Sequence, residues 1–132
     1  MTVDSWDPNS GSELSSLDLE RFCRAAMELD TAQFGLSDHE IARLAPFSRH
    51  QGNIDWSQLA AELDSEVVVG LIRLFTLGEG VFPAWEAGAR SPVVPLVGLL
   101  KSRNAYPREL TKWIKANTSN RFLPHGSLMD RL

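Results

Sequence analysis

One stretch near the middle of the chain is apolar on almost every side, and it limits the folds that the chain can adopt. Residues 67–77 read Val-Val-Val-Gly-Leu-Ile-Arg-Leu-Phe-Thr-Leu, so a helix here would be covered with apolar side chains around nearly its whole circumference. Three consecutive valines also suit a β-strand, but no polar alternation follows them. A helix that is apolar all round belongs inside a core. The sequence therefore predicts an all-α fold around a central helix at 67–77.

Two helix starts on the N-terminal side of this stretch carry the same capping signal. Ser37 is followed three residues later by Glu40, and Asp55 is followed in the same way by Gln58. In each pair the first side chain accepts a hydrogen bond from the backbone of the first turn, and the second side chain reaches back to the cap. The spacing predicts helices that begin just after Ser37 and Asp55, which supports the all-α interpretation of the stretch that follows.

The remaining elements follow from apolar spacing and from proline positions, and the chain as a whole is predicted to hold five to seven helices in one domain. The predicted helices span residues 17–29, 38–45, 56–63, 66–77, 95–102 and 107–116. We expect a flexible lead-in at 1–16 and a single helical domain over 17–132, in which the tail 121–132 packs against the body. The residues expected to dominate the core are Phe22, Ile41, Leu44, Leu59, Leu63, Val68, Leu71, Ile72, Phe75, Leu110, Trp113 and Ile114.

Length and composition narrow the class of protein. The chain has 132 residues, of which 43% are hydrophobic and 23% are charged, as in an ordinary soluble domain. Cys23 is the only cysteine, which excludes an intrachain disulfide and a cysteine-based zinc site. The first residues lack the pattern of a secretory signal, and no apolar stretch is long enough to span a bilayer. The sequence therefore predicts a cytoplasmic protein that does not enter a membrane.

No catalytic or cofactor motif stands out. The three histidines lie far apart in the sequence, and none has a second histidine or a cysteine at a metal-ligand spacing. The segment Gly78-Glu79-Gly80 lacks the remaining glycine of a dinucleotide-binding loop. Glu79 and Glu86 form a candidate acid–base pair, but solvated loop acids are the more common explanation of two such residues. We therefore predict no catalytic residue, no metal site and no cofactor.

Charge is distributed unevenly along the chain. Residues 1–66 carry a net charge of −9 and residues 67–132 a net charge of +5, which together give the overall −4. In the last predicted helix, Arg108, Lys112 and Lys115 fall on the side opposite the apolar residues. The predicted cationic surface comprises Lys101, Arg103, Arg108, Lys112, Lys115 and Arg121.

Three interpretations of this cationic surface stay open. It is a solvated face or one neutralised by the acidic half of the chain, it binds another protein or a second copy, or it binds nucleic acid. The overall negative charge counts against a dedicated nucleic-acid binder. The sequence therefore favours a non-catalytic protein–protein interaction or adaptor module. The alternatives are an accessory nucleic-acid-binding protein and an enzyme whose site is not visible in the linear sequence, formed around residues 78–92.

Overall fold

The computed structural model describes residues 16–29, 33–49 and 54–126, and within these residues the chain is all-α with no strands. This confirms the predicted fold class. The α-helices are α1 (Ser16–Glu28), α2 (Asp38–Leu44), α3 (Trp56–Leu59), α4 (Ser65–Val81), α5 (Val93–Ser102) and α6 (Leu110–Asn117). Single 3₁₀ turns occupy Ala45–Phe47, Pro83–Trp85 and Gly88–Arg90. None of the described helices is long and apolar enough to cross a membrane.

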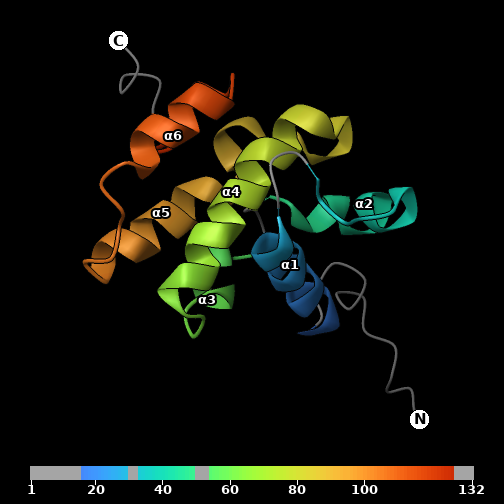
Figure 1. Ribbon diagram of the computed structural model, residues 1–132, viewed down its shortest axis with the longest axis horizontal. Coiled ribbons are helices and arrows are strands. Elements are labelled where there is room, and N and C mark those ends of the chain that lie inside the picture. Colours follow the sequence, from blue (N-terminus) through green and yellow to red (C-terminus); the bar gives the residue numbers. More distant parts are fainter. Residues whose placement is uncertain (1–15, 30–32, 50–53, 127–132) are drawn as a thin grey trace.

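Helix α4 is the centre of the fold, as the sequence predicts. Figure 1 shows it passing through the middle of the molecule, and α1, α5 and α6 all pack on it. Its apolar circumference is covered from several directions, which removes from water the surface that the isolated helix would expose. The buried residues of α4 are Val68, Leu71, Ile72, Leu74, Phe75, Thr76 and Gly78.

Helix α4 continues beyond the predicted end at residue 77 and stops at Val81. The predicted end is therefore wrong, and Gly78 and Gly80 both lie within the helix. Gly78 is buried inside the helix, and a Cβ added there would lie 2.7 Å from the Trp85 ring. Residue 78 must therefore lack a side chain for the indole to pack against it, and this glycine does not end the helix.

Four aromatic rings from separate elements form the middle of the core. Phe22 of α1 lies 5.4 Å from Trp56 and 5.2 Å from Phe75 between ring centroids. Trp85 closes the cluster, at 5.8 Å from Phe22 and 6.0 Å from Phe75. Several of these pairs meet edge to face, the arrangement that aromatic quadrupoles favour. The cluster joins α1, α3, α4 and the 3₁₀ turn after α4.

Both buried indoles also satisfy their polar N–H groups. Trp56 Nε1 donates to the carbonyl of Phe47 over 2.8 Å, and Trp85 Nε1 donates to the carbonyl of Ile41 over 2.9 Å. A buried indole N–H without a partner would carry the cost of its lost hydration. The two bonds therefore fix α2 and the 3₁₀ turn after it against the aromatic cluster.

The predicted core agrees with most of the observed one. Eight of the predicted residues are buried, namely Phe22, Leu44, Val68, Leu71, Ile72, Phe75, Leu110 and Ile114. Four are partly buried and pack against that core, namely Ile41, Leu59, Leu63 and Trp113. The sequence interpretation left out a second set of buried side chains, which comprises Trp56, Trp85, Leu96, Val97, Leu100 and Leu123.

The two predicted caps are present. Ser37 Oγ accepts from the Glu40 amide and Glu40 reaches back to the Ser37 amide, which completes the capping box of α2. Asp55 accepts from the amides of Ser57 and Gln58 at the start of α3. The predicted end of this helix near residue 63 is wrong, because α3 ends at Leu59 and continues as turns.

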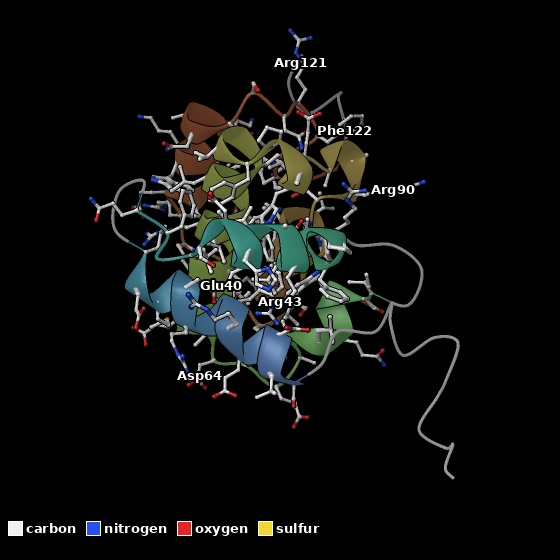
Figure 2. The ribbon with its side chains drawn as sticks, turned by 90° about the vertical axis from the view of Figure 1, so that its right-hand side faces the viewer. Glu40, Arg43, Asp64, Arg90, Arg121 and Phe122 are labelled. Atoms are coloured by element: carbon white, nitrogen blue, oxygen red, sulfur yellow. The ribbon has the colours of Figure 1, made fainter. Side chains whose placement is uncertain are left out.

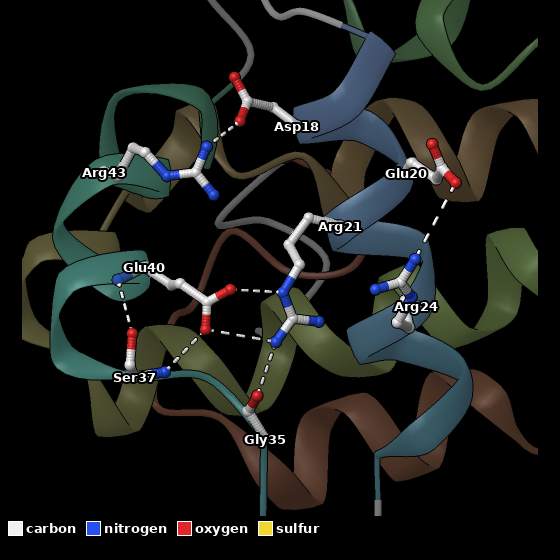
Figure 3. A network of polar contacts seen from close by, with 8 residues as sticks. All are labelled: Asp18, Glu20, Arg21, Arg24, Gly35, Ser37, Glu40 and Arg43. Carbon is white, nitrogen blue, oxygen red and sulfur yellow. Dashed lines mark hydrogen bonds and ion pairs between the residues drawn. The ribbon is translucent and has the colours of Figure 1, made fainter.

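Helices α1 and α2 are held together by a polar network (Figure 3). Arg21 Nε donates to Glu40 Oε2 over 2.6 Å, and its terminal nitrogen donates to the carbonyl of Gly35. Arg43 of α2 pairs in the same way with Asp18 of α1. The bond from Arg21 is the main cause that lowers the pKa of Glu40 to about 2, and the Ser37 amide adds to it. Glu40 therefore serves at once as cap and as ion-pair partner.

The starts of the last two helices differ from the predicted positions. Helix α5 begins at Val93 rather than at Pro95, so Pro95 lies within the first turn, where its missing N–H costs nothing. Helix α6 begins at Leu110, and residues 108–109 form a turn before it. In the tail, Leu123 is buried, whereas the predicted packing of residues 127–132 lies outside the described residues. Of the predicted lead-in at 1–16, residues 1–15 also lie outside them, and Ser16 is the first residue of α1.

Candidate interaction surface

Two of the predicted cations lie on α6, and a third lies in the turn before it. Leu110 and Ile114 of α6 are buried against the body of the protein. Lys112 is exposed and Lys115 is half-exposed, and positions three residues apart project from one side of a helix. Arg108 is exposed in the turn that precedes the helix. We refer to Arg108, Lys112 and Lys115 as the α6 cationic face.

The acidic half of the chain does not neutralise this face within the described part of the molecule. No ion pair among those residues involves Arg108, Lys112 or Lys115. The recorded ion pairs all lie within the N-terminal half, where arginines of α1 and α2 meet nearby carboxylates. They join Arg21 with Glu40, Arg24 with Glu20 and Arg43 with Asp18. The carboxylates of Asp18 and Glu40 are thus paired with arginines of α1 and α2 and not with the cations of α6.

Arg103 has a structural role that the sequence interpretation did not consider. Its guanidinium donates to the carbonyls of Ala61 and Leu63, each over 2.7 Å, and to the carbonyl of Ala60 over 3.3 Å. These carbonyls follow α3, where the chain turns towards α4. A planar five-donor group suits such a cluster of orphan acceptors. Arg103 therefore closes the end of α3 and is not part of the α6 cationic face.

The two remaining predicted cations lie apart from α6. Lys101 Nζ lies 3.2 Å from His125 Nδ1 and 5.3 Å from the centre of the Tyr106 ring. Arg121 projects from one end of the molecule, and Asp64 lies at the opposite end (Figure 2). Of the six predicted residues, the structure thus places Lys112 and Lys115 on α6 and Arg108 in the turn before it, holds Lys101 and Arg103 against other parts of the protein and leaves Arg121 at the tip.

Arg73 is a cation of this surface that the sequence interpretation missed. It is exposed on α4, and its guanidinium lies over the Trp113 ring of α6, 5.7 Å from the centroid. Such a stack orders the arginine while leaving its charge available to a ligand. Arg73 is the only charged residue within the apolar stretch 67–77. In the sequence, this isolated charge indicates which side of α4 faces solvent.

An apolar groove lies beside Arg73, between the end of α1 and α4. Its volume is about 420 Å³. It is lined by Ala26, Met27, Leu29, Glu66, Val69, Gly70, Arg73 and Pro107. The α4 residues among them are spaced by three and four, so they form one stripe along the helix. At Gly70 a Cβ would lie 3.3 Å from Ala26 Cβ, which shows how closely α1 approaches α4 there.

A second cavity, of about 340 Å³, contains the acid pair considered above. It is lined by Glu79, Gly80, Glu86, Thr118, Ser119 and Asn120. The Glu79 carboxylate accepts from the amides of Ala87 and Gly88 and from the Asn120 side chain. Glu79 thereby connects the loop after α4 to the segment after α6. The residues that line this cavity include no histidine and no cysteine.

A metal site is not formed by the described residues, in which no group of three or more His, Cys, Asp or Glu side chains could hold an ion. Cys23 is half-buried, and burial is the main cause that raises the pKa of its thiol. A thiol in that state is a poor nucleophile.

No protein-family model, no curated protein and no solved structure matches this chain.

Proposed function

We propose that the protein is a non-catalytic interaction module that binds an acidic segment of another protein through the α6 cationic face. The observation that carries this proposal is the arrangement of Arg108, Lys112 and Lys115. Lys112 and Lys115 lie on α6 and Arg108 lies in the turn before it, and no described residue forms an ion pair with them, although the chain is acidic overall. Cations without internal partners lose little when a partner's carboxylates replace water around them.

An acidic protein segment suits this face better than a nucleic acid. Lys112 and Lys115 lie about 4.5 Å apart along the axis of α6, at about 1.5 Å per residue, and Arg108 lies in the turn before the helix. A polyanion that extended beyond α6 would meet the acidic N-terminal half, where the net charge of residues 1–66 is −9. A short acidic segment can stay within the cationic area. We place the module in the cytoplasm as part of the proposal, on the support of its single cysteine.

Binding of charged probes tests the proposal. Fluorescence anisotropy would compare a labelled glutamate-rich peptide with a single-stranded oligonucleotide of equal charge, at about 50 mM and about 200 mM salt. We expect the peptide to bind at low salt. The double charge reversal Lys112→Glu with Lys115→Glu should weaken it by about tenfold or more, because two attractive contacts become repulsive.

The matched control is Lys101→Glu with Arg121→Glu, which changes the net charge equally but leaves α6 intact. It should weaken the peptide by no more than about threefold through long-range electrostatics. Equal losses in both double variants would show a nonspecific charge effect and overturn the proposal. Tighter binding of the oligonucleotide, lost with the α6 reversals, would replace it with the nucleic-acid alternative. No binding of either probe at low salt would reject both.

A further inference from the structure

We propose that the acidic segment is an amphipathic helix whose apolar side lies in the groove between α1 and α4. Its carboxylates would then meet Arg73 and the adjoining α6 cationic face. This inference rests on the proposed function, because it names the chemistry of the partner that the same surface would bind. It commits to one occupant, a helix of another protein with one apolar side and one acidic edge.

The lining of the groove favours an apolar guest. Six of its eight lining residues are apolar. The two charged ones, Glu66 and Arg73, lie seven residues apart on α4. Met27 lines the groove and is 57% exposed. An unbranched thioether adapts its shape to different guests. Apolar side chains of a partner would remove this surface from water.

Two residues link the groove to α6 and to the α6 cationic face. Arg73 lines the groove and also stacks on Trp113 of α6. Pro107 lines the groove and directly precedes Arg108. A guest seated in the groove would therefore lie against Arg73 and close to Arg108. The charges also set a direction, because Glu66 at the other end of the α4 stripe would repel carboxylates placed there.

The backbone of the partner must satisfy its own polar groups in this setting. An extended peptide usually does so by adding a strand to the edge of a sheet. The described residues contain no sheet, so they offer no such edge. A helix carries its hydrogen bonds within itself and needs only a groove for its apolar stripe. Glu66, Val69, Gly70 and Arg73 recur every three or four residues along α4. The apolar side chains on one side of a guest helix would recur at the same interval.

Two synthetic peptides of identical composition test the inference. In the first, leucines recur every three or four residues with glutamates gathered along one edge, and in the second the same residues are shuffled so that no stripe remains. We expect the first peptide to bind at least about tenfold more tightly, because only its apolar stripe can enter the groove. Circular dichroism of the bound peptide should show helix.

Variants of the protein identify the groove as the cause. Met27→Gln with Val69→Thr keeps the side-chain shapes but makes the groove polar, and it should remove most of the difference between the two peptides. The matched control is Leu17→Gln with Val81→Thr, at residues of α1 and α4 that are 74% and 52% exposed and do not line the groove. This control should keep the difference. Thermal melts confirm that both variants fold, and Met27→Gln alone serves if the double variant does not.

The outcomes separate this inference from the proposed function. If both peptides bind equally and both are lost with Lys112→Glu and Lys115→Glu, the inference is overturned and the proposed function stands. If the striped peptide is preferred but the groove variant keeps the preference, the inference is again overturned. If the striped peptide binds and the α6 reversals change nothing, the proposed function fails instead.

Discussion

Gly78 and Trp85 fit together so closely that residue 78 has no room for a side chain. A Cβ at Gly78 would lie 2.7 Å from Cε3 of the indole and 3.0 Å from Cζ3. Trp85 in turn is 2% exposed and donates its N–H to Ile41 across the core. The contact therefore sets how the 3₁₀ turn after α4 packs on the helix and on α2.

We predict that Gly78→Ala destabilises the protein by about 1–2 kcal/mol, since the overpacking outweighs the better helix propensity of alanine. The matched control is Gly80→Ala in the same helix, where an added Cβ meets nothing within 4 Å. That variant should be more stable than the wild type by about 0.5–1 kcal/mol. Urea denaturation followed by circular dichroism measures both. Equal effects of the two substitutions would contradict the proposed role of the Trp85 contact.

Arg103→Ala should lower the free energy of unfolding by about 2 kcal/mol, because several carbonyls at the end of α3 lose a charged donor. Arg103→Lys should recover only part of this loss, since an ammonium cannot match the planar fork. Arg108→Ala is the control and should change stability by less than about 0.5 kcal/mol. Thermal denaturation of the three variants checks the prediction. A neutral Arg103→Ala would show that water satisfies these carbonyls equally well.

Acid should weaken the contact between α1 and α2. The folded-state pKa of Glu40 is about 2, below its ordinary value of 4.5, so the folded state holds this proton less tightly than the unfolded chain. The contribution to stability is complete above about pH 4.5 and is lost as the pH falls towards 2. Glu40→Gln should be less stable than the wild type at pH 7, and the gap should close in that acid window. Denaturation curves at several pH values measure it, and a gap independent of pH would refute the assignment.

Asn120→Asp should destabilise the protein in a way that depends on pH. The Asn120 amide donates to both Glu79 carboxylate oxygens, at 2.9 Å and 3.2 Å, so the substitution replaces a donor with a second carboxylate. Two ionised carboxylates in contact repel each other, and we expect a loss of about 1–2 kcal/mol at neutral pH. The loss should shrink in acid, once one of the two carboxyls is protonated. Asn120→Ala is the control, because it loses the same bond but should show little of this acid recovery.

The parts of the fold that the sequence predicted depend on short-range signals. The capping box of Ser37 and Glu40 lies within four residues, and the apolar circumference of residues 67–77 is visible in one window. Both are present in the structure. The errors involve partners far away in the chain. The end of α3 depends on Arg103, about 40 residues later, and the length of α4 depends on how Trp85 packs against Gly78.

The same distinction applies to the candidate surface. The periodicity of α6 was enough to separate the buried Leu110 and Ile114 from the exposed Lys112, but Arg108 lies in the turn before the helix. That periodicity could not show that Arg103 turns towards the carbonyls after α3, or that Arg73 of α4 lies against Trp113. The groove could not be foreseen either, because it forms where the end of α1 meets α4 and Pro107. Contacts between segments distant in sequence have no signature within any one segment.

The ion pairs between α1 and α2 have a consequence for how the molecule behaves at a distance. Arg21 pairs with Glu40 and Arg43 pairs with Asp18, so these charges cancel within the N-terminal half and leave the cations of α6 without an ion-pair partner among them. The field of those cations would therefore attract an anionic group before contact in dilute salt, whereas at about 0.15 M salt it would act over only about 8 Å.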